Sequence, residues 1–211
     1  MRDVGSNKDI LVPPTVVVPE AYAYNDKVGE EWLAVGGLSR ATLGSAIDTR
    51  YRLYQKDRDE LYAARINPIA KFQNSGVVIW GQKTLQVAET ALNRINVRRL
   101  LINLKRFISD TSKAFVFEQN TNATQIKLKN KLNPYMEDVK AKQGLYAYRI
   151  VVDDSNNTSD VIGRNELLVN VYISPTGTIE FILLTFSISP LGVSFNTGFN
   201  WKAVLIQENI F

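Results

Sequence analysis

The segment from Gly76 to Leu104 constrains the fold of this chain most strongly, because its hydrophobic period changes partway along. Val77 to Trp80 form a short apolar run, rich in β-branched residues and closed by Gly81, which is typical of a buried strand that ends in a turn. From Val97 onward, apolar residues recur every three or four positions, as on one face of a helix. The pattern predicts a buried strand at 77–80 and an amphipathic helix over 97–108.

Six side chains are predicted to lie in the hydrophobic core. Four come from the strand and the helix just described, and two come from an apolar stretch at 178–188, both faces of which are largely apolar. The predicted core residues are Val78, Trp80, Leu101, Leu104, Phe181 and Leu183.

The residue types that the chain lacks argue against most kinds of active site. It contains no Cys and no His, so thiolate metal sites, cysteine nucleophiles and histidine bases have no residue to carry them. We therefore expect a protein that is not an enzyme and has no cofactor and no metal site. With 45% hydrophobic and 22% charged residues, the composition is that of an ordinary soluble globular protein.

Charge and hydropathy also limit the partners. The 25 basic and 21 acidic residues form a mixed surface rather than a basic footprint, so no nucleic-acid binding is expected. No apolar run approaches the roughly 18 residues of a membrane-spanning helix, so no membrane insertion is expected. The first residues lack the apolar segment of a signal peptide, which predicts synthesis in the cytoplasm.

The first third of the chain is predicted to contain an extended arm and two helices. Residues 1–19 carry three prolines around a valine run, which favours an extended arm or linker. Residues 20–35 have the spacing of a helix that ends at a Gly-Gly pair. A short helix follows Asp57 and is stopped by the Asn67-Pro68 step.

After the 97–108 helix, the pattern predicts a short strand at 115–118 and a second long helix. Asn120 to Asn122 supply the capping turn of that helix, and Gly144 stands where a left-handed C-cap residue belongs. Pro134 lies inside the helical pattern, so it either kinks the helix or divides it in two.

The residue pattern in the last third of the chain predicts three strands, at 146–152, 166–173 and 178–188. The last two are expected to form a hairpin. Together with the helices, they indicate an α+β fold with a mixed or antiparallel sheet, flanking helices and extended terminal arms. The predicted division is an arm at 1–19, a core domain at 20–190 and a carboxy-terminal arm at 191–211.

Alternation continues beyond Pro190, with the large apolar side chains at odd positions. Two interpretations remain open. The segment is either the final edge strand of the chain's own sheet or an arm that adds a strand to a neighbouring subunit. The residues expected to make such contacts between subunits are Val193, Phe195, Phe199, Trp201 and Leu205, with Arg98 and Arg99 on the helix.

Several apparent chemical motifs have simpler explanations. The 76–84 segment is close to a phosphate-binding loop, but Gln82 interrupts its Gly-Lys step and four bulky apolar residues fill its interior. The acidic loop from Asp153 to Asp160 lacks the glycine and glutamate of a calcium loop and is better explained as a solvated loop. The carboxylates at 57–60 suit the first turn of a helix.

A series of short motifs occurs in the order found in one protein family. They are Val12-Pro-Pro, Ala21-Tyr-Ala-Tyr-Asn-Asp, Trp32-Leu-Ala with Gly36-Gly37, Leu61-Tyr62 with Ile66-Asn67-Pro68-Ile69, Gly76 to Leu85, Asn96-Val-Arg-Arg-Leu100 and Phe115 to Asn120. With this series, the chain resembles the carboxy-terminal half of contractile phage tail sheath proteins. The resemblance continues more loosely to Phe186. The long amino-terminal region usual in that family is missing, so we expect a fragment or a reduced member.

The resemblance implies a structural subunit that polymerises with itself into stacked rings around a tail tube and contracts to drive the tube through the host envelope. It implies contacts with the tail tube, baseplate and tail terminator proteins, a place in the virion tail, and assembly in the host cytoplasm. One alternative is the sheath of a bacterial contractile injection or type six secretion system. An alternative of a different class is a small ligand- or cation-binding module that uses the 153–160 loop or the 76–84 segment.

Overall fold

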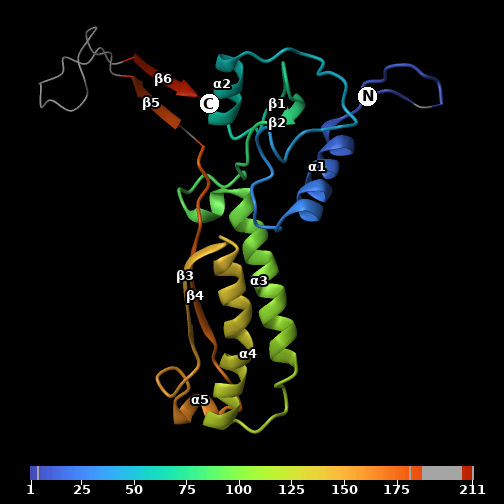
Figure 1. The fold of residues 1–211 in the computed structure, drawn as a ribbon. Coiled ribbons are helices and arrows are strands. Elements are labelled where there is room, and N and C mark those ends of the chain that lie inside the picture. The colour runs from blue at the N-terminus through green and yellow to red at the C-terminus, as the bar shows by residue number, and fades with distance from the viewer. Residues whose placement is uncertain (4, 181, 187–205, 211) are drawn as a thin grey trace, which may run out of the picture. The chain divides into compact units, whose positions relative to one another are not determined.

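The protein is described by a computed structural model that covers residues 1–3, 5–180, 182–186 and 206–210 (Figure 1). The chain divides into two compact units, residues 1–177 and 178–211, which are described separately. The elements in chain order are α1 (Pro14–Val28), α2 (Gln55–Ala63), β1 (Ile69–Phe72), β2 (Gly76–Ile79), a 3-10 turn η1 (Ala91–Asn93), α3 (Ile95–Lys113), α4 (Asn122–Ala141), β3 (Leu145–Val151), α5 (Ser159–Gly163), β4 (Asn170–Pro175), β5 (Ile182–Phe186) and β6 (Ile206–Ile210).

This mixture of helices and strands confirms the predicted α+β class. The described strands form antiparallel two-stranded ladders, β1–β2, β3–β4 and β5–β6, instead of one mixed sheet. The predicted pairing of the last two strands as a hairpin is wrong. β4 pairs with β3, from Val151 opposite Asn170 to Leu145 opposite Pro175, whereas β5 pairs with β6.

Helix α1 begins earlier than predicted, so the extended arm ends before residue 19. Pro14 occupies the first helical turn, where the missing backbone N–H is not needed and the fixed φ suits a helix. Pro19 lies inside the helix and is tolerated there. The helix is held by burial of Val17 and Ala21, one turn apart, in a cluster with β2. This tertiary contact outweighs the local preference of the proline-rich sequence for an extended chain.

The predicted strand at 77–80 is confirmed as β2, and Val78 is fully buried as expected. β1, which the sequence pattern did not reveal, pairs with it from Ile69 opposite Ile79 to Phe72 opposite Gly76. Trp80 follows the strand and is only partly buried, with its ring 4.7 Å from that of Phe72. It therefore covers the edge of this cluster rather than its centre.

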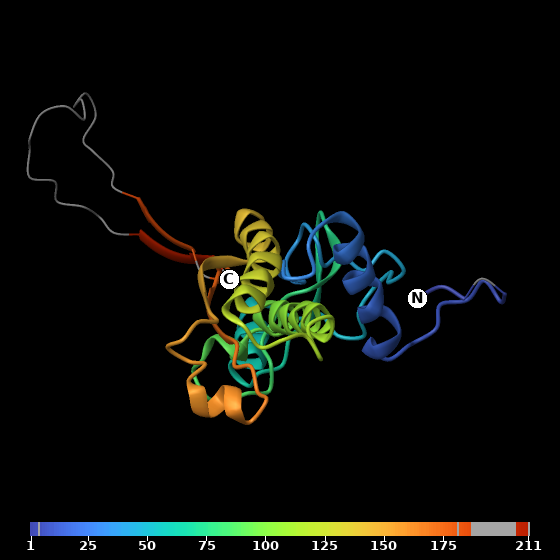
Figure 2. The same ribbon diagram turned by 90° about the horizontal axis from the view of Figure 1, so that it is seen from below.

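Helix α3 confirms the predicted 97–108 helix and extends it at both ends. Leu104 is buried as predicted, whereas Leu101 lies on the flank of the helix and is partly buried. α4 continues without a break through Pro134. Figures 1 and 2 show α3 and α4 side by side, with the β3–β4 ladder against α4. The second cluster forms here, from Trp32, Leu100, Leu104, Leu128, Leu132, Met136, Val139, Leu145, Ile150 and Val152.

The predicted strand at 115–118 is wrong, because this segment is the turn between α3 and α4. Phe115 packs against the second cluster, and Phe117 takes a left-handed backbone conformation with φ 74°. A chain that must reverse direction between two antiparallel helices leaves no room for a strand here, despite the β propensity of these residues.

Helix α4 ends differently from the prediction as well. The left-handed residue is Gln143, with φ 62°, and not Gly144. The amide of Gly144 donates to the Val139 carbonyl at 2.8 Å and that of Gln143 to the Lys140 carbonyl at 3.0 Å, which is a Schellman motif. Gly144 is needed for space, since a Cβ there would lie 2.7 Å from Val139 Cγ1 and 2.9 Å from Trp32 Nε1.

The second unit contains the β5–β6 ladder. Leu183 lies in β5 opposite Asn209. Phe181 and most of the predicted arm, including all five apolar residues proposed for contacts between subunits, lie outside the described residues. Among the described residues, the predicted central strand at 178–188 is reduced to 182–186 with β6 as its partner.

Replacing Gly144 with Ala should lower the free energy of unfolding by about 1–3 kcal/mol, because the new methyl group collides with Trp32 and Val139. Replacing Gln143 with Gly should leave that free energy unchanged or raise it by up to about 1 kcal/mol, since glycine accepts a positive φ without strain. Urea unfolding of both variants measures the difference. If Gln143→Gly were the more damaging change, the described helix end would be wrong.

Candidate assembly surface

Arg99, expected to contact another subunit, joins α3 to α1 within the chain. Its Nη2 atom lies 2.5 Å and 2.6 Å from the two carboxylate oxygens of Asp26. The guanidinium carbon also lies 5.2 Å from the centre of the Tyr22 ring. Burial raises the pKa of the Tyr22 hydroxyl, and the charge of Arg99 opposes that rise. The Arg99 side chain is only 18% exposed, so most of its surface is already used inside the subunit.

Arg98 lies on the exposed side of the same helix. Its Nε donates to the Leu92 carbonyl at 3.1 Å and its Nη2 donates to the Gln86 side-chain oxygen at 2.7 Å. These bonds hold the loop before α3 against the helix. Of the two arginines, Arg98 is therefore the one that a neighbouring subunit can reach.

A second set of polar contacts joins the segment after α1 to α3 and α4. The Trp32 indole N–H donates to the Lys142 carbonyl at 3.1 Å. The Lys142 ammonium group lies 3.0 Å from carboxylate oxygens of both Glu30 and Asp138, and its hydrogen bonds to them raise the pKa of this lysine. Asn103 donates to Glu31 at 2.9 Å. Because the contacts converge near Trp32, they fix the first part of the unit against the second.

The segment that resembles a phosphate loop has a structural role. Lys83 Nζ donates to the Tyr62 carbonyl at 2.8 Å and lies 3.8 Å from the centre of the Tyr62 ring. The Asn67 side chain donates to the Lys83 carbonyl at 2.9 Å and accepts from the Lys83 amide at 2.8 Å. A Cβ at Gly81 would lie 2.9 Å from both Asn67 and Tyr62. The motif therefore ties 81–83 to the end of α2, a role that the Asn-Pro step alone did not indicate.

The polar side chains of the acidic loop at 153–160 likewise form hydrogen bonds within the chain, with backbone groups of the loop and of Leu168. Asn157, which is buried, donates to the Leu168 carbonyl at 3.0 Å and accepts from the Leu168 amide at 2.7 Å. Asp153 accepts from the amide of Ser155 at 3.0 Å, and the hydrogen bonds from Ser155 lower the pKa of its carboxyl. Among the described residues, no three Asp or Glu side chains come together as a metal site would require.

The carboxylates near α2 also act on the helix itself. Asp57 accepts from the Tyr54 amide at 2.8 Å, as a capping residue does.

Within the described ranges, no helix has the length and apolar character needed to cross a membrane.

The β5–β6 ladder offers a surface suited to strand addition. Five residue pairs hold it together, from Ile182 opposite Ile210 to Phe186 opposite Ile206. Each strand of a two-stranded ladder directs alternate backbone groups away from its partner, so among the described strands this ladder has two outer edges. A ladder of this size is only marginally stable in water by itself, which favours its joining a larger sheet.

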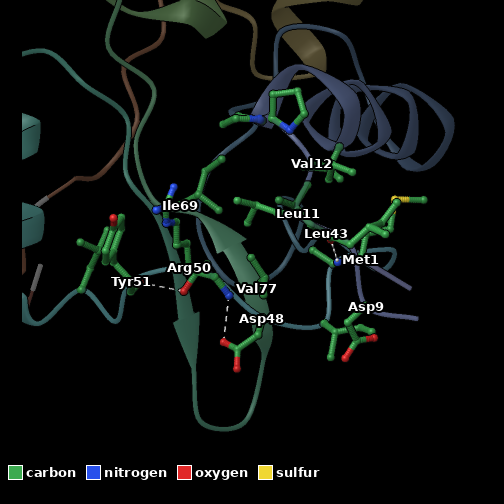
Figure 3. Close-up of a pocket in the computed structure, with 18 residues that line it drawn as sticks. Met1, Asp9, Leu11, Val12, Leu43, Asp48, Arg50, Tyr51, Ile69 and Val77 are labelled. Atoms are coloured by element: carbon green, nitrogen blue, oxygen red, sulfur yellow. Dashed lines mark hydrogen bonds between the residues drawn. The ribbon is translucent and has the colours of Figure 1, made fainter. Parts of the chain in front are cut away.

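An apolar groove of about 800 Å³ lies in the first unit (Figure 3). Met1, Leu11 and Val12 line one side of it, and Arg50 and Tyr51 line the other. Leu43, Ile69 and Val77 form part of its wall, so the groove adjoins the β1–β2 cluster.

Comparison with known proteins shows which proteins this chain is similar to. Residues 88–189 match the model of the phage tail sheath C-terminal domain. The chain is 35% identical over 184 residues to the tail sheath protein of Vibrio phage KVP40, a match that covers 87% of this chain and 27% of the relative.

The chain contains a phage tail sheath C-terminal domain and is homologous to phage tail sheath proteins.

The tail sheath protein of Enterobacteria phage T4 is also 35% identical, over 185 residues, covering 88% of this chain and 28% of that protein. The chain thus spans about a quarter of the length of these two tail sheath proteins. A phage tail sheath protein is a structural component of the virion tail and not an enzyme.

Solved structures share the fold of this tail sheath chain. The sheath of the PVC extracellular contractile injection system in its contracted state superposes with a TM-score of 0.78, at 24% identity, over 86% of this chain and 52% of that one. The helical sheath of the anti-feeding prophage in its contracted state gives a TM-score of 0.76, at 24% identity, over 84% of this chain and 51% of that one.

Replacing Arg99 with Ala should lower the free energy of unfolding by about 1–2 kcal/mol. Both carboxylate oxygens of Asp26 would lose the guanidinium group that they contact, and this guanidinium group is partly shielded from water. Arg99→Lys should recover only part of this loss: one nitrogen, Nη2, makes both contacts to Asp26, which an ammonium group can imitate, but an ammonium group does not stack on the Tyr22 ring as a planar guanidinium does. Thermal or urea unfolding of the purified variants gives the values.

Arg98→Ala is the matched control, from the exposed side of the same helix. Its effect should be smaller than that of Arg99→Ala, at about 0.5 kcal/mol, because the two hydrogen bonds that it loses to the loop before α3 are exposed to water. Equal losses for Arg98→Ala and Arg99→Ala would contradict the structural role assigned to the Arg99–Asp26 pair.

Proposed function

We propose that this chain is a structural subunit of a contractile phage tail sheath. Subunits associate with one another into rings that stack around the tail tube, and contraction of the assembled sheath drives the tube through the host envelope. Homology to phage tail sheath proteins supports this proposal, as does a fold shared with contracted sheaths. The partners would be further copies of the chain, the tail tube protein, and the baseplate and tail terminator proteins, with assembly in the host cytoplasm.

The observation that carries the proposal is that the chain contains both a compact unit with two buried clusters and, as a separate unit, the β5–β6 ladder. A sheath subunit must keep its contacts while it changes orientation, which calls for a stiff body and pairing that survives rotation. Residues 1–177 provide such a body through two buried clusters joined near Trp32. The outer edges of the ladder provide backbone groups for pairing with a strand of another copy.

The carboxy-terminal segment is the proposed partner strand. Val193, Phe195, Phe199, Trp201 and Leu205 alternate along it and, in this proposal, bury their side chains against the neighbouring subunit. Arg98 would contribute at the periphery, where an exposed charge affects the rate and specificity of association more than its strength.

A bacterial contractile injection system is the second candidate. The shared fold with the PVC and anti-feeding prophage sheaths favours it. The 35% identity to phage sheath proteins, against 24% to these sheaths, supports the phage assignment.

Deletion of residues 193–211 removes both the proposed partner strand and β6, and so tests the strand-addition proposal as a whole. Because the two clusters of the first unit lie outside the deleted segment, the truncated chain should keep its helical circular dichroism and a cooperative unfolding transition. It should fail to form rings or tubes under conditions in which the full chain does, as judged by electron microscopy and sedimentation.

A matched variant with Ser at Phe195, Phe199 and Trp201 keeps the backbone and removes only the large apolar side chains. We expect it to assemble more weakly than the full chain and more strongly than the truncation, since its main-chain pairing remains. Undiminished assembly of the truncated chain would eliminate the arm as an intersubunit strand.

A further inference from the structure

Phe117, at the tip of the α3–α4 turn, is exposed to an extent unusual for an aromatic residue. Its side chain is 101% exposed, and that of the preceding Val116 is 60% exposed. Phe115, by contrast, packs against the hydrophobic cluster of α3 and α4 and holds the turn in place. The tip therefore presents two adjacent apolar side chains to water on a fixed support.

The backbone at Phe117 adds a second unfavourable feature. With φ 74°, it occupies the left-handed region, which is rare for a bulky residue and easy for Gly or Asn. Among the described residues with positive φ other than glycine, Phe117 is the one with a large apolar side chain. Strained backbone and an exposed phenyl ring at the same residue are a combination typical of contact sites.

The apolar groove of Figure 3 adjoins the β1–β2 cluster of the same unit. Figure 1 shows the α3–α4 turn and the β1–β2 ladder at opposite ends of α3, a helix of 19 residues that is about 28 Å long at 1.5 Å per residue. Phe117 cannot reach the groove of its own unit. At about 800 Å³, the groove has the size of pockets that hold small organic groups. It is therefore large enough to hold the side chains of Phe117 and Val116 at the same time.

We propose that Phe117 and Val116 of one copy insert into the groove of a second copy of this chain, between Leu11 and Val12 on one side and Tyr51 on the other. This inference rests on the proposed function, because it supplies a contact between subunits distinct from strand addition. The partner is a second copy because the projection and the groove belong to the same unit and lie toward opposite ends of α3.

Charges beside the two surfaces are complementary. Near the tip, Lys113 and Glu118 are exposed, and the rim of the groove carries Asp48 and Arg50. Within the chain, Asp48 is already paired with Lys71 at 3.1 Å and Lys113 with Asp110 at 2.8 Å. Exposed Glu118 can approach Arg50 on the rim of the groove. This pair places opposite charges beside an apolar centre, as protein interfaces commonly do.

The geometry of the contact has a consequence for assembly. A projection that fits a groove elsewhere on the same molecule forms a head-to-tail contact, which repeats from copy to copy and builds a ring or a helix. A contact related by a two-fold axis would stop at a dimer. The arrangement thus suits a subunit of an extended polymer.

Cysteine cross-linking tests the contact directly, since the chain has no cysteine of its own. Phe117→Cys is mixed with Ile47→Cys, whose side chain lines the groove and is half-exposed, and the mixture is oxidised. We expect disulfide-linked dimers to form at least roughly tenfold faster than in a mixture of Leu85→Cys with Ile47→Cys, because a disulfide needs Cα atoms within about 7 Å. Leu85 is a matched control, being exposed and outside both surfaces.

Equal rates in the two mixtures would overturn the proposal. So would dimers formed by Phe117→Cys alone at the rate of the mixture, because they would indicate a two-fold contact at the tip. Since the cross-link is measured in solution, it reports on this contact whether or not tubes form. Tubes without the cross-link would refute only this inference, whereas a full-length chain that never forms rings or tubes would refute the proposed sheath function.

The variant Phe117→Asn separates assembly from folding. Asn accepts the left-handed conformation, so the melting temperature should stay the same or rise. The concentration needed for assembly should increase roughly tenfold or more, as when a central apolar anchor is lost from an interface. Leu85→Asn should leave that concentration unchanged. A fall in melting temperature without weaker assembly would assign Phe117 a folding role and contradict the proposal.

Discussion

The packing of the segment around Trp32 is the constraint on which the rest of residues 1–177 depends. Trp32 lies in the cluster of α3, α4 and β3, whereas Val35, three residues later, lies in the cluster of α1 and β2. The indole donates to the Lys142 carbonyl, and the missing side chain of Gly144 leaves room for the ring. A few consecutive residues thus join two cores, and the Arg99–Asp26 pair reinforces the joint from α1. The two cores therefore lie within one compact unit.

The sequence predicts the elements whose period is regular and whose burial is local. The 77–80 strand and the 97–108 helix are found where the hydrophobic period places them. The errors occur where tertiary contacts outweigh local preference. Burial of Val17 and Ala21 makes a proline-rich segment helical, and the reversal between α3 and α4 turns an aromatic run at 115–118 into a tip. Strand pairing was also mispredicted, because β propensity alone does not reveal which strands are partners.

The surface residues were harder to predict than the elements. Arg98 and Arg99 are adjacent in sequence, yet only the structure separates an exposed side chain from one clamped to Asp26, a residue far away in the chain. The networks of Lys83 with Tyr62 and of Asn157 with Leu168 replace two apparent ligand motifs with structural roles. In the proposed subunit, the first unit carries the projecting Phe117 and the second unit carries the strand edges of β5–β6, and each surface offers a different kind of contact.

Hydrogen exchange of the chain before and after assembly tests the central claim, that subunits join by adding strands to the β5–β6 ladder while the body stays intact. Amides of α3, α4 and β3 should be protected in both states, since buried clusters already hold them. Amides of 182–186 and 206–210 should exchange quickly in the free chain and become strongly protected in the assembly. Unchanged protection of these two strands on assembly, or loss of protection in α3 and α4, would contradict the account.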